Sequence, residues 1–150
     1  MSVFNKNLLY FVDTNIFLRS LVKENEKLYQ ESLKFLKLIS SRKIRAYIST
    51  PVIMEINFVL SSFYKFGKEK ITGALESIIN FPSLKIIDDF DHNTALDLYI
   101  NHNVKFIDCL FASSRLIQQN QACIVSFDED FKKLPLKSCQ PKELVCYYKI

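Results

Sequence analysis

Residues 8–15 have the sequence Leu-Leu-Tyr-Phe-Val-Asp-Thr-Asn, and this stretch decides the fold expected for the chain. Five consecutive apolar residues, rich in aromatic and branched side chains, indicate a β-strand buried on both faces. The run stops at Asp13, and the helical pattern Ile16-Phe17-Leu18 follows two small polar residues. An aspartate between a buried strand and a helix lies at the carboxyl edge of a sheet, where ligands bind in open α/β folds. Asp13 is therefore the first candidate for chemistry.

The rest of the chain alternates between strand-like and helix-like segments. Strands are predicted at Ala46–Ser49, Leu84–Ile87, Ala122–Ser126 and near Leu144–Tyr147. Helices are predicted after Asp13 to about Val22, and then at about Asn25–Ser41, Thr50–Gly67, Lys68–Phe81, His92–His102 and Val104–Asn120. This alternation predicts an α/β fold with one parallel or mostly parallel sheet, covered by helices on both faces.

Length and composition limit the class of protein. A chain of 150 residues fits one domain, residues 1–150, and 49% hydrophobic with 24% charged residues is typical of a globular protein. The two glycines, Gly67 and Gly73, exclude a glycine-rich phosphate loop after the first strand. No apolar run is long enough to cross a bilayer, and the N-terminus lacks a signal-peptide pattern. The expectation is a cytoplasmic protein with no membrane partner.

Cysteine spacing and charge add weaker constraints. The cysteines have no paired C-x-x-C spacing, which disfavours a zinc site, and Cys109 and Cys123 lie in apolar runs expected to keep them buried and reduced. A net charge of +4 suits a polyanionic substrate, but a charge this small is weak evidence, and ordinary solubility is the preferred explanation. The lysines and arginines between Lys23 and Arg45 form either a basic face for RNA phosphates or an ordinary solvated helix face.

Two carboxylates stand in segments that are otherwise apolar. Between Pro51 and Leu60 only Glu55 and Asn57 are polar, and between Val104 and Ala112 only Lys105 and Asp108 are charged. A carboxylate buried in such a segment needs a partner, because its desolvation is costly. Glu55 follows the predicted N-cap Thr50 by five residues, and Asp108 follows the predicted N-cap Asn103 by the same spacing. Both acids would therefore feel the positive end of a helix dipole.

Asp128 completes the set of acids, because it follows a buried strand just as Asp13 does. Carboxylates from four segments, namely Asp13, Glu55, Asp108 and Asp128, could then converge on one edge of the sheet. Acids this close repel one another unless a cation neutralises them, and Mg²⁺ or Mn²⁺ is the expected ion for oxygen ligands. Such a site is equipped to hydrolyse a phosphodiester. Thr14, Asn15 and Ser126 flank the acids and are expected to orient ligands or water.

Each acid also has an ordinary structural explanation. Asp13 could cap the helix that follows it, and Asp128 and Asp130 could be simple turn acids. Ion pairs could instead join Glu55 to Arg45 or Lys65, and Asp108 to Lys105 or Arg115. Four such coincidences together are much less probable than any one of them.

Taken in order, the motifs resemble the PIN-domain pattern. They are Val12–Leu18, Glu55 near a helix start, Phe106–Ala112 and Ser126–Phe131. The length of the chain is most similar to that of the VapC type, the ribonuclease toxins of toxin–antitoxin pairs. The resemblance implies a five-stranded parallel sheet flanked by helices and a Mg²⁺- or Mn²⁺-dependent endoribonuclease. It also implies a homodimer that a small cognate antitoxin inhibits.

The resemblance makes Asp13, Glu55, Asp108 and Asp128 the catalytic and metal-binding residues. Ser126 stands where threonine is more usual, and this change keeps the hydroxyl group. Asp130 could share or take the fourth position, because the turn offers three acids. Asp128 is preferred, with Asp130 second.

Three competing functions remain open at this stage. One is a PIN-like module that binds RNA or a protein without cleaving, and another is a PIN nuclease in RNA maturation. The third is a phospho-acceptor domain of the receiver kind. Receiver domains usually carry an acidic pair after the first strand, whereas Asp13 is followed by Thr14 and Asn15, so this function ranks low.

Overall fold

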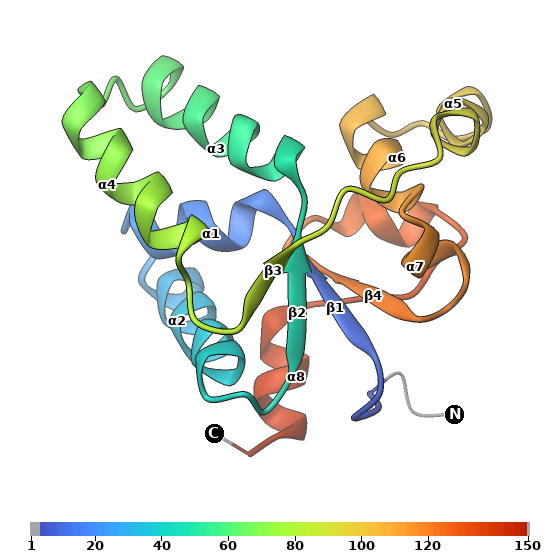
Figure 1. The fold of residues 1–150 in the computed structure, drawn as a ribbon, viewed down its shortest axis with the longest axis horizontal. Coiled ribbons are helices and arrows are strands. Elements are labelled where there is room, and N and C mark those ends of the chain that lie inside the picture. The colour runs from blue at the N-terminus through green and yellow to red at the C-terminus, as the bar shows by residue number, and fades with distance from the viewer. Residues whose placement is uncertain (1–3, 150) are drawn as a thin grey trace.

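The computed structural model describes residues 4–149, and its centre is a five-stranded parallel sheet (Figure 1). The strands are β1 (Leu9–Val12), β2 (Arg45–Ile48), β3 (Leu84–Ile86), β4 (Ala122–Val125) and β5 (Ser138–Cys139), in the order β3-β2-β1-β4-β5. The central strand β1 pairs in parallel with both β2 and β4. The strand order therefore reverses between β1 and β4, and ligands of open α/β sheets bind at such a point.

Helices cover both faces of the sheet. They are α1 (Thr14–Leu21), α2 (Glu26–Ser40), α3 (Thr50–Ser62), α4 (Lys68–Ile79), α5 (His92–Asn101), α6 (Phe106–Ala112), α7 (Arg115–Gln118) and α8 (Pro141–Tyr147), with a 3₁₀ helix η1 (Glu129–Lys133). Tyr10 interacts with Tyr148 just beyond α8, whereas the ring of Phe11 lies 5.0 Å from that of Phe111 in α6. Successive residues of a strand point to opposite faces. The three-layer α/β fold with a five-stranded parallel sheet is thus confirmed.

The fifth strand lies elsewhere than the sequence predicted. Residues Leu144–Tyr147 belong to α8, and the strand is the two-residue β5. Pro141 begins α8, and the backbone N–H of Gln140 donates to Glu143 Oε1 at 3.1 Å. These are helix-start signals, and they outweigh an apolar run too short to distinguish a strand from a helix.

The predicted helix Val104–Asn120 is two short helices, α6 and α7, and its N-cap is Lys105 instead of Asn103. The break falls at Ser114, whose backbone is not helical. The Ser114 hydroxyl lies 2.8 Å from the Tyr47 hydroxyl and donates to Asp89 Oδ2 at 3.0 Å. These tertiary hydrogen bonds hold Ser114 outside the helix, which local periodicity could not reveal.

The start of α3 also differs in detail from the prediction. Ser49 is its N-cap and makes no side-chain cap bond, while Thr50 is the first helical residue. Asp88 supplies the cap from a distance, since its carboxylate accepts from Thr50 N at 2.7 Å and from Thr50 Oγ1 at 2.5 Å. Asp88 follows β3, so a residue at the end of β3 fixes the start of α3, the helix that follows the neighbouring strand β2.

Short polar connections complete the carboxyl end of the sheet. Asp89 Oδ2 accepts from Leu116 N at 3.0 Å in α7, and Asp91 caps α5 by accepting from Thr94 N at 3.0 Å. Cys109 and Cys123 are buried free thiols, as expected. No helix in the described part of the chain has the length and apolar character needed to cross a membrane.

Candidate active site

A cavity of about 260 Å³ opens at the carboxyl edge of the sheet, where α3 and α6 lie to either side of the strand ends (Figure 1). Its lining includes all four predicted acids, Asp13, Glu55, Asp108 and Asp128. They come from the β1–α1 junction, from α3, from α6 and from the residues after β4. The fold therefore brings together carboxylates that the sequence separates by up to 115 positions.

Asp13 is held rigidly at the floor of this cavity. Its side chain is only 5% exposed, and its backbone N–H extends the pairing of β1 with β4 by donating to Val125 O at 3.0 Å. One carboxylate oxygen accepts from Thr14 N at 2.8 Å, and the other accepts from Ser126 Oγ at 2.6 Å. Asp13 is thus the N-cap of α1 and a lining residue of the cavity, so its structural and chemical explanations are compatible.

Ser126 and Asn15 join the β1 side of the cavity to the β4 side. The Ser126 hydroxyl donates to Asp13 and accepts from Asn15 Nδ2 at 3.1 Å and from the backbone N–H of Asp128 at 2.9 Å. Asn15 Oδ1 in turn accepts from Phe127 N at 3.3 Å. This network fixes the positions of Asp13 and Asp128 relative to each other, which is the orienting arrangement expected for these two polar residues.

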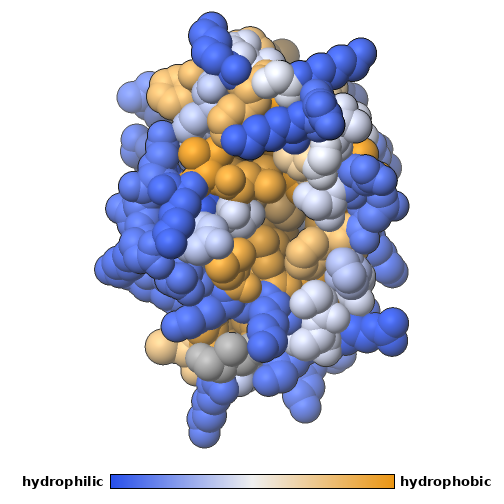
Figure 2. Space-filling model, turned by 90° about the vertical axis from the view of Figure 1, so that its left-hand side faces the viewer, coloured by the Kyte–Doolittle hydropathy of each residue, from blue (hydrophilic) through white to orange (hydrophobic). Residues whose placement is uncertain are grey.

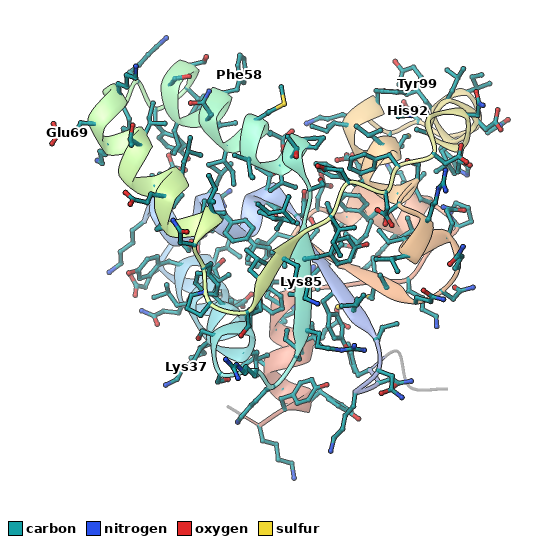
Figure 3. The ribbon with its side chains drawn as sticks, in the orientation of Figure 1. Lys37, Phe58, Glu69, Lys85, His92 and Tyr99 are labelled. Atoms are coloured by element: carbon teal, nitrogen blue, oxygen red, sulfur yellow. The ribbon has the colours of Figure 1, made fainter. Side chains whose placement is uncertain are left out.

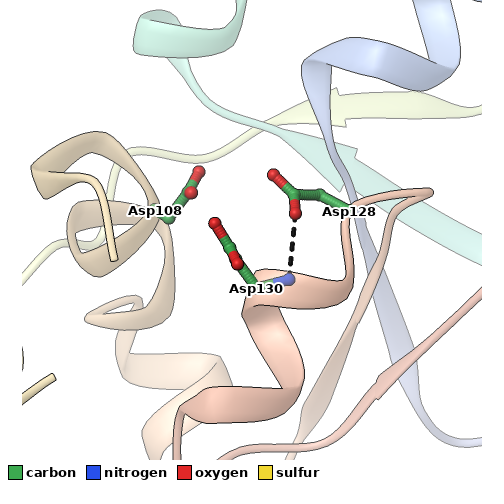
Figure 4. Close-up of side chains that lie close together, drawn as sticks. All are labelled: Asp108, Asp128 and Asp130. Atoms are coloured by element: carbon green, nitrogen blue, oxygen red, sulfur yellow. Dashed lines mark hydrogen bonds between the residues drawn. The ribbon is translucent and has the colours of Figure 1, made fainter. Parts of the chain in front are cut away.

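Asp108, Asp128 and Asp130 face one another from α6 and from the residues around η1 (Figure 4). Each offers a carboxylate oxygen, and the three oxygens all lie within 4.8 Å of one another. Asp128 Oδ1 accepts from Asp130 N at 2.9 Å, and Asp130 pairs with Lys133 at 2.8 Å. Asp128 lines the cavity, whereas Asp130 is not among the lining residues but lies close to Asp108 and Asp128, so the geometry keeps both acids available for the fourth position.

Burial and mutual repulsion perturb two of the acids. Burial raises the pKa of Asp13 to about 6; hydrogen bonds from Ser126 and Thr14 oppose this shift, while the charges of Glu55 and Asp128 add to it. Burial also raises the pKa of Asp108 to about 7, and the charges of Asp13, Asp128 and Glu55 raise it further. Carboxyl groups whose pKa values are raised by burial and by neighbouring negative charges mark a place where positive charge is needed.

Basic side chains do not supply that charge through direct contact. The described residues form four ion pairs, and none of them includes Asp13, Glu55, Asp108 or Asp128. Arg45, one proposed partner of Glu55, instead donates to the backbone oxygen of Asn7 at 2.6 Å. Lys105 lines the cavity and lowers the pKa of Asp108 only as the last of five influences.

The same cavity has side chains that sequence reasoning did not place there. Lys105 contributes a positive charge at the start of α6, and Leu18, Val59 and Ile107 form apolar walls. Apolar walls strengthen electrostatic interactions inside a cavity, because they exclude water. The one available signal was Lys105 itself, a lysine three residues before Asp108 in an otherwise apolar segment.

The donor set fits a hard divalent cation. Asp108 is only 6% exposed, and its Oδ2 is buried without a hydrogen-bond partner among the described residues. The Oγ1 atom of Thr14, another lining residue, is buried and unpartnered in the same part of the structure. Unsatisfied oxygens next to several carboxylates are what Mg²⁺ or Mn²⁺ would satisfy.

Comparison with known families now adds to this geometry. Residues 10–137 match the PIN domain family. The chain is a PIN domain protein. This family membership confirms the resemblance seen in the sequence and sets aside the receiver-type alternative, because the acids, the strand order and the family match all point to one fold.

Individual relatives of this PIN domain carry the VapC name. A VapC ribonuclease of Aquifex aeolicus (strain VF5) is 29% identical over 132 residues, covering 88% of this chain and 96% of the relative. The VapBC2 structure from Rickettsia felis, solved with a DNA fragment from its promoter, gives a TM-score of 0.64 at 24% identity and covers 89% of this chain and 98% of its own. VapC20 of Mycobacterium tuberculosis, described as a sarcin-ricin loop cleaving toxin, gives a TM-score of 0.63 at 17% identity. The match covers 85% of this chain and 95% of the VapC20 chain. These structural similarities establish the fold.

Proposed function

We propose that this PIN domain is a divalent-metal-dependent endoribonuclease and the toxin of a toxin–antitoxin pair. One observation carries the proposal: carboxylates from four separate segments line one cavity at the carboxyl edge of the sheet, and none of them has an ion-pair partner among the described residues. The likeness to a VapC ribonuclease over 88% of the chain supports the choice of RNA as substrate.

Asp13, Glu55, Asp108 and Asp128 would hold Mg²⁺ or Mn²⁺, with Asp130 placed to share the role of Asp128. When bound, such an ion supplies a Lewis acid for a phosphate oxygen and lowers the pKa of a water molecule. The raised pKa values of Asp13 and Asp108 mean that binding of the ion would release protons from these groups.

The chain's own polar groups would organise the reaction around these acids. Ser126 and Asn15 keep Asp13 and Asp128 in register, and Lys105 offers a positive charge to an RNA phosphate. Leu18, Val59 and Ile107 limit the access of bulk water. Attack of water on phosphorus with departure of the 3′ oxygen would leave a 5′-phosphate and a 3′-hydroxyl.

The partner of such a toxin would be a small cognate antitoxin, and the surface offers a place for it. An apolar hollow of about 280 Å³ lies between α1, α3 and α4, lined by residues that include Leu21, Leu60 and Phe66. Figure 2 shows apolar side chains hollowing this face inside a polar rim. Leu18 and Val59 of the acidic cavity lie on the same two helices. An antitoxin segment in the hollow would therefore extend toward the cavity.

The protein is also proposed to form a homodimer, and exposed apolar side chains on α5 and α6 support this. Leu96, Tyr99 and Ile100 on α5 are 48%, 49% and 70% exposed, and Phe106 at the start of α6 is 44% exposed. Tyr99 lies on the outer side of the molecule (Figure 3), and its ring is 5.6 Å from that of Phe106. A second copy of the chain would cover this surface.

The compartment proposed for the protein is the cytoplasm, where RNA is plentiful.

The test is cleavage of RNA by purified protein with Mn²⁺, with Mg²⁺ or with chelator. We expect cleavage that requires the metal and falls at least 100-fold in Asp13→Asn, because this change removes one ligand charge at the floor of the cavity. Asp97→Asn, on the exposed face of α5, is the matched control and should cleave as the wild type does. End labelling of the products should show 5′-phosphates and 3′-hydroxyls.

Two outcomes would change the conclusion. Cleavage unaffected by both chelator and Asp13→Asn would exclude the proposed chemistry. RNA binding without turnover under any divalent metal would favour a module that binds RNA or protein without cleaving. Arrested growth on expression of the wild type but not of Asp13→Asn would separate a toxin from a nuclease of RNA maturation.

A further inference from the structure

A second cavity, of about 380 Å³, lies at the amino end of the sheet, and neither the family match nor the proposed function accounts for it. We call it the basic cavity. Its charged lining residues are Arg42, Arg45 and Lys85, and its lining includes no carboxylate. The remaining lining residues are Leu9, Ile44, Ala46 and Ser83. The volume falls within the range of cavities that hold small-molecule ligands.

The basic cavity is formed by segments that only the fold brings together. Arg42 follows α2, Arg45 begins β2, and Lys85 lies on β3, the edge strand that pairs with β2. Lys85 lies on this strand in front of the sheet in the view of Figure 3. Strands of four residues span about 13 Å, so this cavity and the acidic cavity lie at opposite ends of the sheet.

The cations of the basic cavity are available to a ligand. Arg45 uses one N–H to donate to the backbone oxygen of Asn7 at 2.6 Å, which orients its guanidinium group and leaves other donors free. The side chains of Arg42 and Lys85 form no hydrogen bond or ion pair with any other residue of the described range 4–149. Unpaired cations around a hollow concentrate positive potential and attract anions.

The backbone at Arg42 gives a second, independent argument. Arg42 N–H donates to Ile39 O at 2.9 Å and Lys43 N–H donates to Leu38 O at 2.9 Å, which is the helix-ending pattern that places glycine at the position of Arg42. Arg42 nevertheless adopts φ 61°, and Ser83 in the same cavity adopts φ 66°. A residue other than glycine in this conformation costs backbone strain, so the side chains of Arg42 and Ser83 are present where glycine would be less strained.

The chemistry of the lining identifies the class of ligand. Guanidinium groups recognise phosphate through paired N–H donors, and a lysine adds a point charge. Leu9 offers a half-buried apolar side chain beside the cations, with the buried Ile44 and Ala46 next to it, and such a lining suits a flat ring system better than a bare ion. We propose that the basic cavity binds a nucleoside monophosphate, with the phosphate between Arg42, Arg45 and Lys85 and the base against the apolar residues.

The test is calorimetric titration of the wild-type protein with AMP in the presence of chelator, which leaves the acidic cavity without a cation to attract the phosphate. We expect binding with a dissociation constant below about 1 mM, and at least tenfold weaker binding of adenosine or of inorganic phosphate. Equal affinity for inorganic phosphate would mean an adventitious ion only and would overturn the proposal. Binding of RNA oligomers without binding of AMP would overturn it as well.

Variants locate the binding. Arg42→Gly removes the guanidinium group from a position whose backbone suits glycine, so we expect an unchanged or higher melting temperature and at least tenfold weaker AMP binding. Lys85→Gln should weaken binding by about the same factor. Lys37→Gln, an exposed residue of α2 outside the cavity, is the control and should bind as the wild type does. Unchanged affinity in both Arg42→Gly and Lys85→Gln would overturn the proposal, and neither variant should affect RNA cleavage.

Discussion

The two ends of the sheet carry opposite charges, and they differ in how far those charges are buried. At the carboxyl end, four acids from distant segments are gathered around one cavity, and Asp13 and Asp108 are 5% and 6% exposed. At the amino end, the cations Arg42, Arg45 and Lys85 are all exposed. Because Asp13 and Asp108 are buried, their ionised forms are poorly solvated, whereas the two arginines and the lysine remain solvated. The fold therefore bears a cost at the acidic end that it does not bear at the basic end.

The largest effect is expected for the pH dependence of stability, measured in the presence of chelator. The pKa values of Asp13 and Asp108 are raised to about 6 and about 7 in the folded protein. Their contribution to stability is fully present below the pKa of the unfolded groups, near 4, and is lost as the pH rises through 6 and 7. Removal of one acid by Asp108→Asn should therefore stabilise the protein more at pH 8 than at pH 5, by a difference on the order of 2 kcal/mol.

Denaturant unfolding of the wild type and of Asp108→Asn at both pH values measures this difference. Lys85→Gln, at the amino end, should show no such change, because Lys85 lies outside the acidic cavity. Mn²⁺ added at pH 8 should stabilise the wild type far more than Asp108→Asn, since an ion that binds only the folded state raises its stability. A wild type and an Asp108→Asn variant that differ equally at both pH values would contradict the electrostatic cost described for the acidic end.

The next test concerns the hydrogen bonds that hold the acids. Ser126 Oγ contacts Asp13, Asn15 and the backbone N–H of Asp128. Ser126→Ala should reduce cleavage and Mn²⁺ affinity by roughly 30-fold, the scale seen when residues that orient metal ligands are changed. Ser126→Thr keeps the hydroxyl and should retain most activity. Ser83→Ala, which removes a hydroxyl at the amino end, should leave cleavage unchanged, and an equal loss in both alanine variants would point to general destabilisation.

The smallest expected effect is at Asp88, which shapes the acidic end without lining it. Its carboxylate caps α3 through Thr50, and α3 carries Glu55. Asp88→Ala should destabilise the protein by about 1 kcal/mol, as the loss of a helix cap usually does. Mn²⁺ affinity should fall only a few-fold. Thermal unfolding and metal titration, with Asp97→Ala as the control, measure both effects, and a loss of affinity as large as that of Ser126→Ala would place Asp88 within the metal site.

Sequence reasoning found the acidic end because its signals are local. Asp13 stands directly after one buried apolar run, Asp128 comes three residues after the end of another, and Asp108 is an isolated acid in an apolar helix. The strands β1, β2, β3 and β4 were predicted from short segments that are mostly apolar. Leu144–Tyr147 was assigned wrongly because four apolar residues fit either period, and the helix-start residues around Pro141 decide between them.

The basic end could not be predicted in this way. Arg42 and Arg45 are visible as part of a basic turn, but Lys85 is 40 positions from Arg45 and joins them only through the pairing of β2 with β3. The left-handed backbone at Arg42 and Ser83 has no sequence signature, because the chain uses other residues where glycine is usual. The cap that Asp88 provides for α3 is likewise a contact between segments far apart in the sequence.

The connection Asp88–Asp91 should tolerate the insertion of residues poorly. Asp88 caps α3, Asp89 holds the start of α7, and Asp91 caps α5, so one short connection sets the starting points of three helices. A single residue inserted here would displace all three anchors at once. The chain between α1 and α2 makes fewer such bonds and would accept an insertion. Variation in length during evolution should therefore be concentrated in the second connection and be rare in the first.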